Sequence, residues 1–218
     1  MEKETVETTE LQEQTELQEQ TVTPEKKEKR DPKKTRAFLG ALTEAAVLTA
    51  LALALSFFKL KIGALGGSID LVMVPLIVLA HRRGIKWAVP AGAVFGLAKC
   101  IIGGGIGYGF ASIMLDYVLA YAAVGLAGIF NRFKHGIIIG TVFGSAARFG
   151  VHFLSGITIY KLATAEEFWG MTFQPEAAVA YSLVYNASYM VPNMIVAIIA
   201  ICLLKAAIEH LELKRQYE

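Results

Sequence analysis

Residues 177–204 read AAVAYSLVYNASYMVPNMIVAIIAICLL, a stretch without a charged side chain. About 20 consecutive apolar residues are enough for a helix to cross the hydrocarbon core of a membrane. This stretch is therefore a candidate transmembrane helix. The composition agrees, because 55% of the 218 residues are hydrophobic, 18% are charged and the mean hydropathy is +0.49. A soluble globular domain is excluded.

Five more apolar segments precede this stretch, at 38–58, 69–80, 87–103, 110–130 and 137–159. A membrane-spanning segment must satisfy its own backbone hydrogen bonds, which favours helix, and the alternating pattern of a membrane β-barrel is missing. The segment at 69–80 is too short for a perpendicular crossing, so it either extends back to Gly63 or is irregular. We predict an all-α fold, a six-helix integral membrane bundle that occupies residues 37–210 as one domain.

The charged residues are concentrated at the start of the chain. Residues 1–36 hold 8 of the 21 Lys and Arg residues and 10 of the 19 acidic ones, and they predict a disordered charged tail without a cleaved secretory signal. In the connections between spans, fifteen basic residues fall on one side and three on the other. The positive-inside rule then places both termini in the cytoplasm and makes this a multi-pass protein of the plasma membrane.

Several polar side chains interrupt the apolar segments, and such residues are functional-site candidates because they are costly to leave in lipid. With the predicted topology they converge on one depth, in the outer half of the membrane. Glu44 is separate, near the cytoplasmic end of its helix, where we expect a structural or partner-contact role. The converging residues are Asp70, Lys99, Asp116, Arg148, His152, Tyr181, Tyr185, Asn186 and Tyr189.

This set of side chains favours a pocket for a small, flat molecule that is cationic or rich in nitrogen. Asp116 would offset positive charge or accept from an amino group, and aromatic rings would stack on a heterocycle. His152, Tyr181 and Asn186 would hydrogen-bond its ring nitrogens. Two other interpretations stay open: Asp116 pairs only with Arg148 or Lys99, and the tyrosines form a belt at the membrane interface.

Three motifs together resemble one family. They are 181–192 (YSLVYNASYMVP), Arg148-x-x-x-His152-x-x-Ser-Gly156, and 115–118 (LDYV); 66–75 (GGSIDLVMVP) and 82–84 (RRG) fit the same pattern. The combination, which covers residues 37–205, closely resembles the thiamine-specific substrate-binding (S) component of energy-coupling factor transporters.

The resemblance implies a protein that captures thiamine from outside and delivers it with a transmembrane coupling protein and two cytosolic ATPases. It implies no covalent chemistry, hence no catalytic residue, cofactor or metal, and no nucleic-acid partner. A small-residue face on the first helix, at Ala46, Ala50 and Ala54, is similar to the surface that docks the coupling protein. The implied substrate-binding residues are Asp116, Tyr117, His152, Gly156, Tyr160, Tyr181, Asn186 and Tyr108, with Lys99, Arg148, Asp70 and Tyr185 in support.

The chain departs from the family pattern at three positions. Asp116 stands where some members carry Glu, while Tyr160 and Gly66 stand where some carry Trp. Stacking on the ligand is then weaker here, or is supplied by Tyr108, Phe110 or Trp169.

Three alternative functions remain at this point. The first is an S component for another vitamin or heterocycle. The second is a small intramembrane enzyme that uses Asp116 and His152 as a general acid and base, although no nucleophile or metal set accompanies them. The third is a self-sufficient secondary transporter or channel, for which the expected paired inverted repeats are missing.

Overall fold

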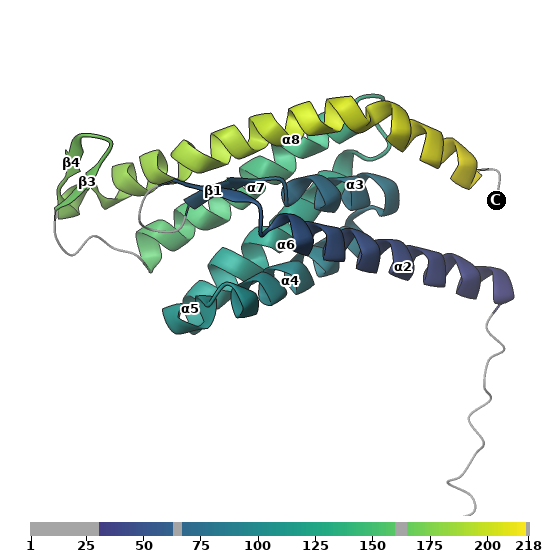
Figure 1. Cartoon of the computed structure of the whole chain (residues 1–218), viewed down its shortest axis with the longest axis horizontal. Helices are drawn as coiled ribbons and strands as arrows, with labels where there is room; N and C mark the ends of the chain where they lie inside the picture. The colour runs from purple at the N-terminus through teal and green to yellow at the C-terminus, as the bar shows by residue number, and fades with distance from the viewer. Residues whose placement is uncertain (1–30, 63–66, 160–164, 217–218) are drawn as a thin grey trace, which may run out of the picture. The chain divides into compact units, whose positions relative to one another are not determined.

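The structure, a computed structural model, describes residues 31–62, 67–159 and 165–216. The chain divides into two units, residues 1–37 and 38–218, and the candidate site lies in the second. Figure 1 shows the helices of the second unit as long ribbons, with two short β-hairpins between them. The predicted tail falls largely on residues 1–30, which lie outside the described residues.

Helices make up most of the described chain, and the segment 110–130 is a run of short helical pieces of different pitch. The helices are α2 (Pro32–Leu55), α3 (Met73–Arg83), α4 (Ile85–Ile102), η1 (Gly105–Tyr108), α5 (Phe110–Ser112), η2 (Ile113–Leu119), α6 (Ala120–Val124), η3 (Gly125–Phe130), α7 (Gly136–Thr158), η4 (Pro175–Ala177) and α8 (Ala178–Gln216). Of these, η1, η3 and η4 are 3₁₀ helices and η2 is a π-helix.

Five helical segments of the described chain are long and apolar enough to span a membrane. Their apolar side chains remain exposed in large part, as expected where the neighbour is lipid; Val94, Leu154 and Ile199 are examples. These segments confirm five of the six predicted spans, with the first and last longer than predicted. The five are Pro32–Leu55, Ile85–Ile102, Phe110–Phe130, Gly136–Thr158 and Pro175–Lys205.

The remaining predicted segment, 69–80, is a short helix preceded by extended chain. Helix α3 has 11 residues, too few to cross a membrane alone. Before it, β1 (Lys59–Ile62) pairs antiparallel with β2 (Gly67–Asp70). The structure therefore supports the irregular form of this segment. A second hairpin, β3 (Glu166–Phe168) with β4 (Met171–Phe173), joins α7 to α8. The all-α prediction did not include these two hairpins.

Helix α2 begins at Pro32, ahead of the predicted boundary at residue 37, so the last residues assigned to the tail are helical. Proline is tolerated in the first turn of a helix because its missing N–H would have no partner there. At the other end of the chain, α8 continues past residue 204 to Gln216.

Glycines let the helices around the site approach closely. A Cβ atom on Gly92 would collide with the backbone carbonyl of Tyr121, and one on Gly96 with that of Tyr117. The four-residue spacing places both glycines on one face of α4, which packs against η2 and α6 (Figure 1). Gly140 on α7 meets Ala127 of η3 in the same way. The small-residue pattern in these helices therefore serves internal packing.

Candidate functional site

Asp116 lies on η2, a π-helical stretch within an otherwise α-helical and 3₁₀ span. Such wide turns are rare and occur mostly as local bulges, frequently at functional sites. Sequence hydropathy does not distinguish a π-turn from an α-turn, so nothing in the residue pattern predicted it. The wide turn sets the direction in which the Asp116 carboxylate leaves the helix.

The Asp116 carboxylate contacts side chains of its own span and of α7. Oδ1 lies 3.2 Å from Nδ1 of His152 on α7, and Oδ2 accepts a hydrogen bond of 2.9 Å from Oγ of Ser112. Because a carboxylate only accepts, the hydrogen between the two residues belongs to Nδ1. Neither of the alternative partners, Arg148 or Lys99, makes a described ion pair with Asp116. The carboxylate is thus held by a hydroxyl and an imidazole, both of which can be neutral.

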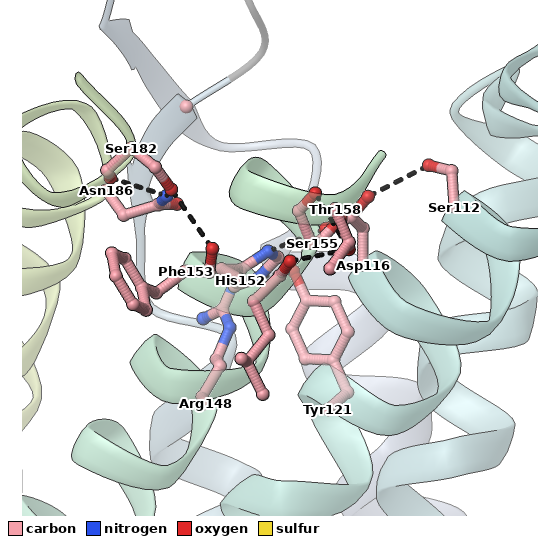
Figure 2. Close-up of polar contacts among 12 residues, drawn as sticks. Ser112, Asp116, Tyr121, Arg148, His152, Phe153, Ser155, Thr158, Ser182 and Asn186 are labelled. Atoms are coloured by element: carbon pink, nitrogen blue, oxygen red, sulfur yellow. Dashed lines mark hydrogen bonds and ion pairs between the residues drawn. The ribbon is translucent and has the colours of Figure 1, made fainter. Parts of the chain in front are cut away.

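Helices α7 and α8 meet where Gly156 faces Ser182. A Cβ atom on Gly156 would collide with Oγ of Ser182, so only glycine permits this approach. Oγ of Ser182 donates to the carbonyl of Phe153 at 3.1 Å, and Nδ2 of Asn186 donates to the carbonyl of Ser182 at 2.8 Å. Figure 2 shows His152 between Asp116 on one side and Asn186 with Ser182 on the other.

The tyrosines of α8 face the protein interior. Tyr181 and Tyr189 are 8% and 6% exposed, which does not fit a belt at the lipid interface. The rings of Tyr181 and Tyr185 are stacked, with centroids 5.9 Å apart, and Tyr189 lies edge-on to His152 at 6.2 Å. Oη of Tyr189 donates to Oδ1 of Asn186 at 2.6 Å. The aromatic stripe, Asn186 and the Asp116–His152 pair are therefore one continuous cluster.

Three of the four supporting residues, Asp70, Lys99 and Arg148, form a second cluster around Tyr121. Nζ of Lys99 lies 3.2 Å from Oδ2 of Asp70 and donates to Oη of Tyr121 at 2.6 Å. Nη2 of Arg148 donates to the same Oη at 3.0 Å. Tyr185, the fourth supporting residue, accepts from the backbone N–H of Gly67 at 2.8 Å, which ties the start of β2 to α8.

Some predicted residues are not brought into the cluster. The ring of Tyr117 lies against Gly105 of η1, where an added Cβ atom would be 2.5 Å from its Oη. Phe110 and Trp169 are 76% and 67% exposed, and the Trp169 ring stacks on Phe168. Gly66, Tyr160 and the side chain of Tyr108 lie outside the described residues, so their predicted roles stay predictions.

The structure adds five residues that the sequence did not single out. Ser112 and Ser182 are hydroxyls of a kind common in membrane helices, and Tyr121 looks like an ordinary residue of an apolar segment. Phe168 lies in the connection between two predicted segments. Asn193 is different, because an amide inside a span signals a polar role. It accepts from the backbone N–H of Asp70 at 2.8 Å and donates to the carbonyl of Ser68 at 2.6 Å.

Several buried polar atoms of α7 have no hydrogen-bond partner among the described residues. They include Nε2 of His152 and Nε and Nη1 of Arg148. With Nδ1 protonated, Nε2 of a neutral His152 is an acceptor, whereas the two arginine atoms are donors. The site therefore offers acceptors, donors and aromatic faces to a bound heterocycle. Among the residues described, no group of three or more His, Cys, Asp or Glu side chains gathers as a metal site would require.

The predicted docking face on α2 is exposed. Ala46, Ala50 and Ala54 lie on its open side, whereas Ala45 and Ala52 are buried in the core. Glu44 forms ion pairs with Arg82 and Arg83, which hold α2 to the end of α3. Glu44 therefore has a structural role, which is one of the two roles that the sequence predicted for it.

Comparison with known proteins points to one family. The family model described as thiamine transporter protein (Thia_YuaJ) matches residues 42–213. The thiamine transporter ThiT of Bacillus subtilis is 32% identical over 180 residues, 75% of this chain and 88% of the relative. ThiT of Lacticaseibacillus paracasei is 27% identical over 181 residues, 75% of this chain and 85% of the relative. A solved structure of ThiT from Listeria monocytogenes superposes with a TM-score of 0.66 at 26% identity, covering 77% of this chain and 94% of that one.

Proposed function

The chain belongs to the thiamine transporter protein family, and on this basis we propose that it binds thiamine between η2, α7 and α8 as the S component of an energy-coupling factor importer. It is a multi-pass bacterial membrane protein and a transport subunit, not an enzyme. The acid–base role considered for Asp116 and His152 is thereby replaced by a binding role.

One observation carries the placement of the ligand. His152 contacts Asp116 of η2 through Nδ1 and lies edge-on to Tyr189 of α8, so residues from three separate spans meet around one imidazole. Polar groups are costly in a membrane interior unless they have a partner or a function. Here they converge with aromatic rings, which is the composition of a site for a small heterocyclic ligand.

The chemistry of thiamine fits these groups. Its aminopyrimidine ring carries an amino donor and ring-nitrogen acceptors, and its thiazolium ring is cationic. The Asp116 carboxylate accepts from the amino group and offsets the positive charge. Nε2 of His152 is an acceptor in the neutral tautomer, so it would accept a hydrogen bond from the amino group of thiamine and could not donate to a ring nitrogen. Asn186 and the Tyr181 ring complete the site by hydrogen bonding and stacking.

Delivery of the vitamin requires partners. In this proposal the exposed face of Ala46, Ala50 and Ala54 docks the transmembrane coupling protein, and two cytosolic ATPases supply the energy. The support is the burial pattern of α2, whose small residues are open on one side while Glu44 holds the other side to α3.

The proposal is tested by titrating the detergent-purified protein with thiamine, monitored by the fluorescence of its two tryptophans and by calorimetry. Riboflavin and biotin serve as competitors. We expect saturable binding of thiamine alone, and Asp116→Asn to weaken it about tenfold or more, because a charged hydrogen bond contributes about 1.5–3 kcal/mol. Absence of thiamine binding by folded protein would contradict the function, whereas unchanged binding by D116N would contradict the pocket.

A further inference from the structure

A network of polar contacts between largely buried side chains lies one helical turn from His152, and Tyr121 is at its centre. Oη of Tyr121 accepts from Nζ of Lys99 at 2.6 Å and from Nη2 of Arg148 at 3.0 Å. Lys99 also pairs with Asp70 at 3.2 Å. The four residues come from the end of β2 and from α4, α6 and α7, so this polar network joins four separate elements.

These contacts are shielded from solvent. Tyr121, Arg148 and Asp70 are 3%, 4% and 6% exposed. The tyrosine ring also lies under both cations, with the Arg148 Cζ atom 4.3 Å and the Lys99 Nζ atom 5.0 Å from its centroid. Hydrogen bonds from charged donors in such surroundings are stronger than in water. A single phenol therefore contacts two cations, of which Arg148 is buried and Lys99 is partly buried.

Arg148 depends on this phenol. No carboxylate among the described residues pairs with its guanidinium, and its Nε and Nη1 atoms have no described hydrogen-bond partner. Arg148 and His152 are four residues apart and share one face of α7. If the Arg148 guanidinium lost its contact with Oη of Tyr121, it would be attracted by the Asp116 carboxylate. That movement would neutralise the group that the ligand needs.

We propose that Tyr121 is a positioning residue for the thiamine site, which holds Arg148 away from Asp116 and links it through Lys99 to Asp70 at the end of β2. This inference rests on the proposed function. It adds a residue that does not itself touch the ligand and gives the Asp70–Lys99 pair a purpose. Asp70 is fixed independently, because Asn193 of α8 accepts from its backbone N–H at 2.8 Å. The polar network is therefore also held at its Asp70 end, by α8.

The test is a double-mutant cycle on thiamine affinity with Tyr121→Phe and Asp70→Asn, two changes that preserve shape. We expect Y121F to raise the dissociation constant about tenfold, the size of one lost charged hydrogen bond. D70N alone should have a smaller effect. The double variant should bind no more weakly than Y121F alone, because Asp70 reaches Arg148 only through Oη of Tyr121.

Thr141→Val is the matched control, because Thr141 is a buried hydroxyl of α7 whose described bond is to the Ile137 carbonyl of its own helix. T141V should leave thiamine affinity within about twofold, since it removes only a local bond. Thermal unfolding of each ligand-free variant shows that it is folded. If Y121F does not fold, the paired change Lys99→Met with Asp70→Asn tests the same link without leaving a buried charge unpaired, and weakened binding is again expected.

Two outcomes would overturn the inference while leaving the proposed function intact. One is a Y121F dissociation constant equal to that of the wild type. The other is fold-changes of Y121F and D70N that multiply in the double variant, which would show independent structural effects. Failure of the wild-type protein to bind thiamine would overturn the proposed function itself, and the inference with it.

Discussion

At the scale of single residues, Gly156 sets how closely α7 and α8 approach beside the site. Any side chain there would meet Oγ of Ser182, whose hydrogen bonds connect Phe153 with Asn186. Ser182 has little freedom to move, because it is 3% exposed. The absence of a Cβ atom at this position is thus part of the helix packing beside the candidate site.

Gly156→Ala should weaken both thiamine binding and stability. Overpacking a tight contact costs about 1–3 kcal/mol, and the displaced Asn186 would lose its place in the site. Gly150→Ala on the same helix is the matched control, since an added Cβ atom there has nothing within 4 Å. It should preserve affinity and stabilise the helix slightly. Titration and thermal unfolding of both variants check this, and equal affinities for G156A and wild type would contradict it.

Individual site residues could be predicted to the extent that they are unusual in lipid. Asp116, His152 and Asn186 stand out in an apolar segment, and the structure brings them together. Tyr121 and Ser182 do not stand out, because a tyrosine or a serine is readily accommodated in a membrane helix. Their importance comes from partners on other helices, which the sequence of one helix does not reveal.

At the scale of elements, the β3–β4 hairpin acts as a support for the aromatic stripe of α8. Phe168, 7% exposed, lies edge-on to Tyr185 at 5.4 Å and to Tyr181 at 6.3 Å. The hairpin turns at Trp169 and Gly170, which both have positive φ angles. A tryptophan in this conformation is uncommon, and the Trp169 ring stacks on that of Phe168.

Phe168→Ala should lower thiamine affinity several-fold while most of the helical fold persists. Truncating a buried Phe costs about 3 kcal/mol, and here the loss falls on the hairpin and on the Tyr181 and Tyr185 rings. Met171→Ala, in the same hairpin but at a 44% exposed position, should bind as the wild type does. Thiamine titration and circular dichroism of both variants make the comparison. Equal affinities would show that the hairpin does not order the rings.

The element predictions were right where hydropathy and length decide, and incomplete where they do not. The long spans follow from the cost of exposing a backbone to lipid. The strands of three or four residues and the π-turn of η2 carry no periodic signal, so the pattern of 59–70, 166–173 and 113–119 could not reveal them. The start of α2 at Pro32 was missed because charged residues there resemble the tail in composition.

At the scale of the whole molecule, the exposed alanine face of α2 predicts a separation of binding from transport. Ala50→Trp should abolish thiamine uptake in cells that contain the coupling protein and ATPases, because a large ring prevents close helix approach. Thiamine binding by the purified variant should be unchanged. Val94→Trp is the control, since it adds the same ring to a position of α4 that is 61% exposed.

Uptake by A50W at the wild-type rate would exclude this face as the docking surface. Loss of both binding and uptake would indicate a folding defect instead. Thiamine accumulation after deletion of the ATPases would support a self-sufficient transporter and contradict dependence on an energy-coupling module.

The π-helical turn that carries Asp116 makes this span sensitive to its residue count. Each residue of an α-helix turns the chain by about 100°, and the wide turn of η2 accommodates more chain than an α-turn of the same rise. Deleting one residue between 113 and 119 would let the segment revert to a regular α-helix and swing the carboxylate away from His152. Related chains can therefore vary freely in side chains on the lipid face of this span, but an insertion or deletion there would change what the protein recognises.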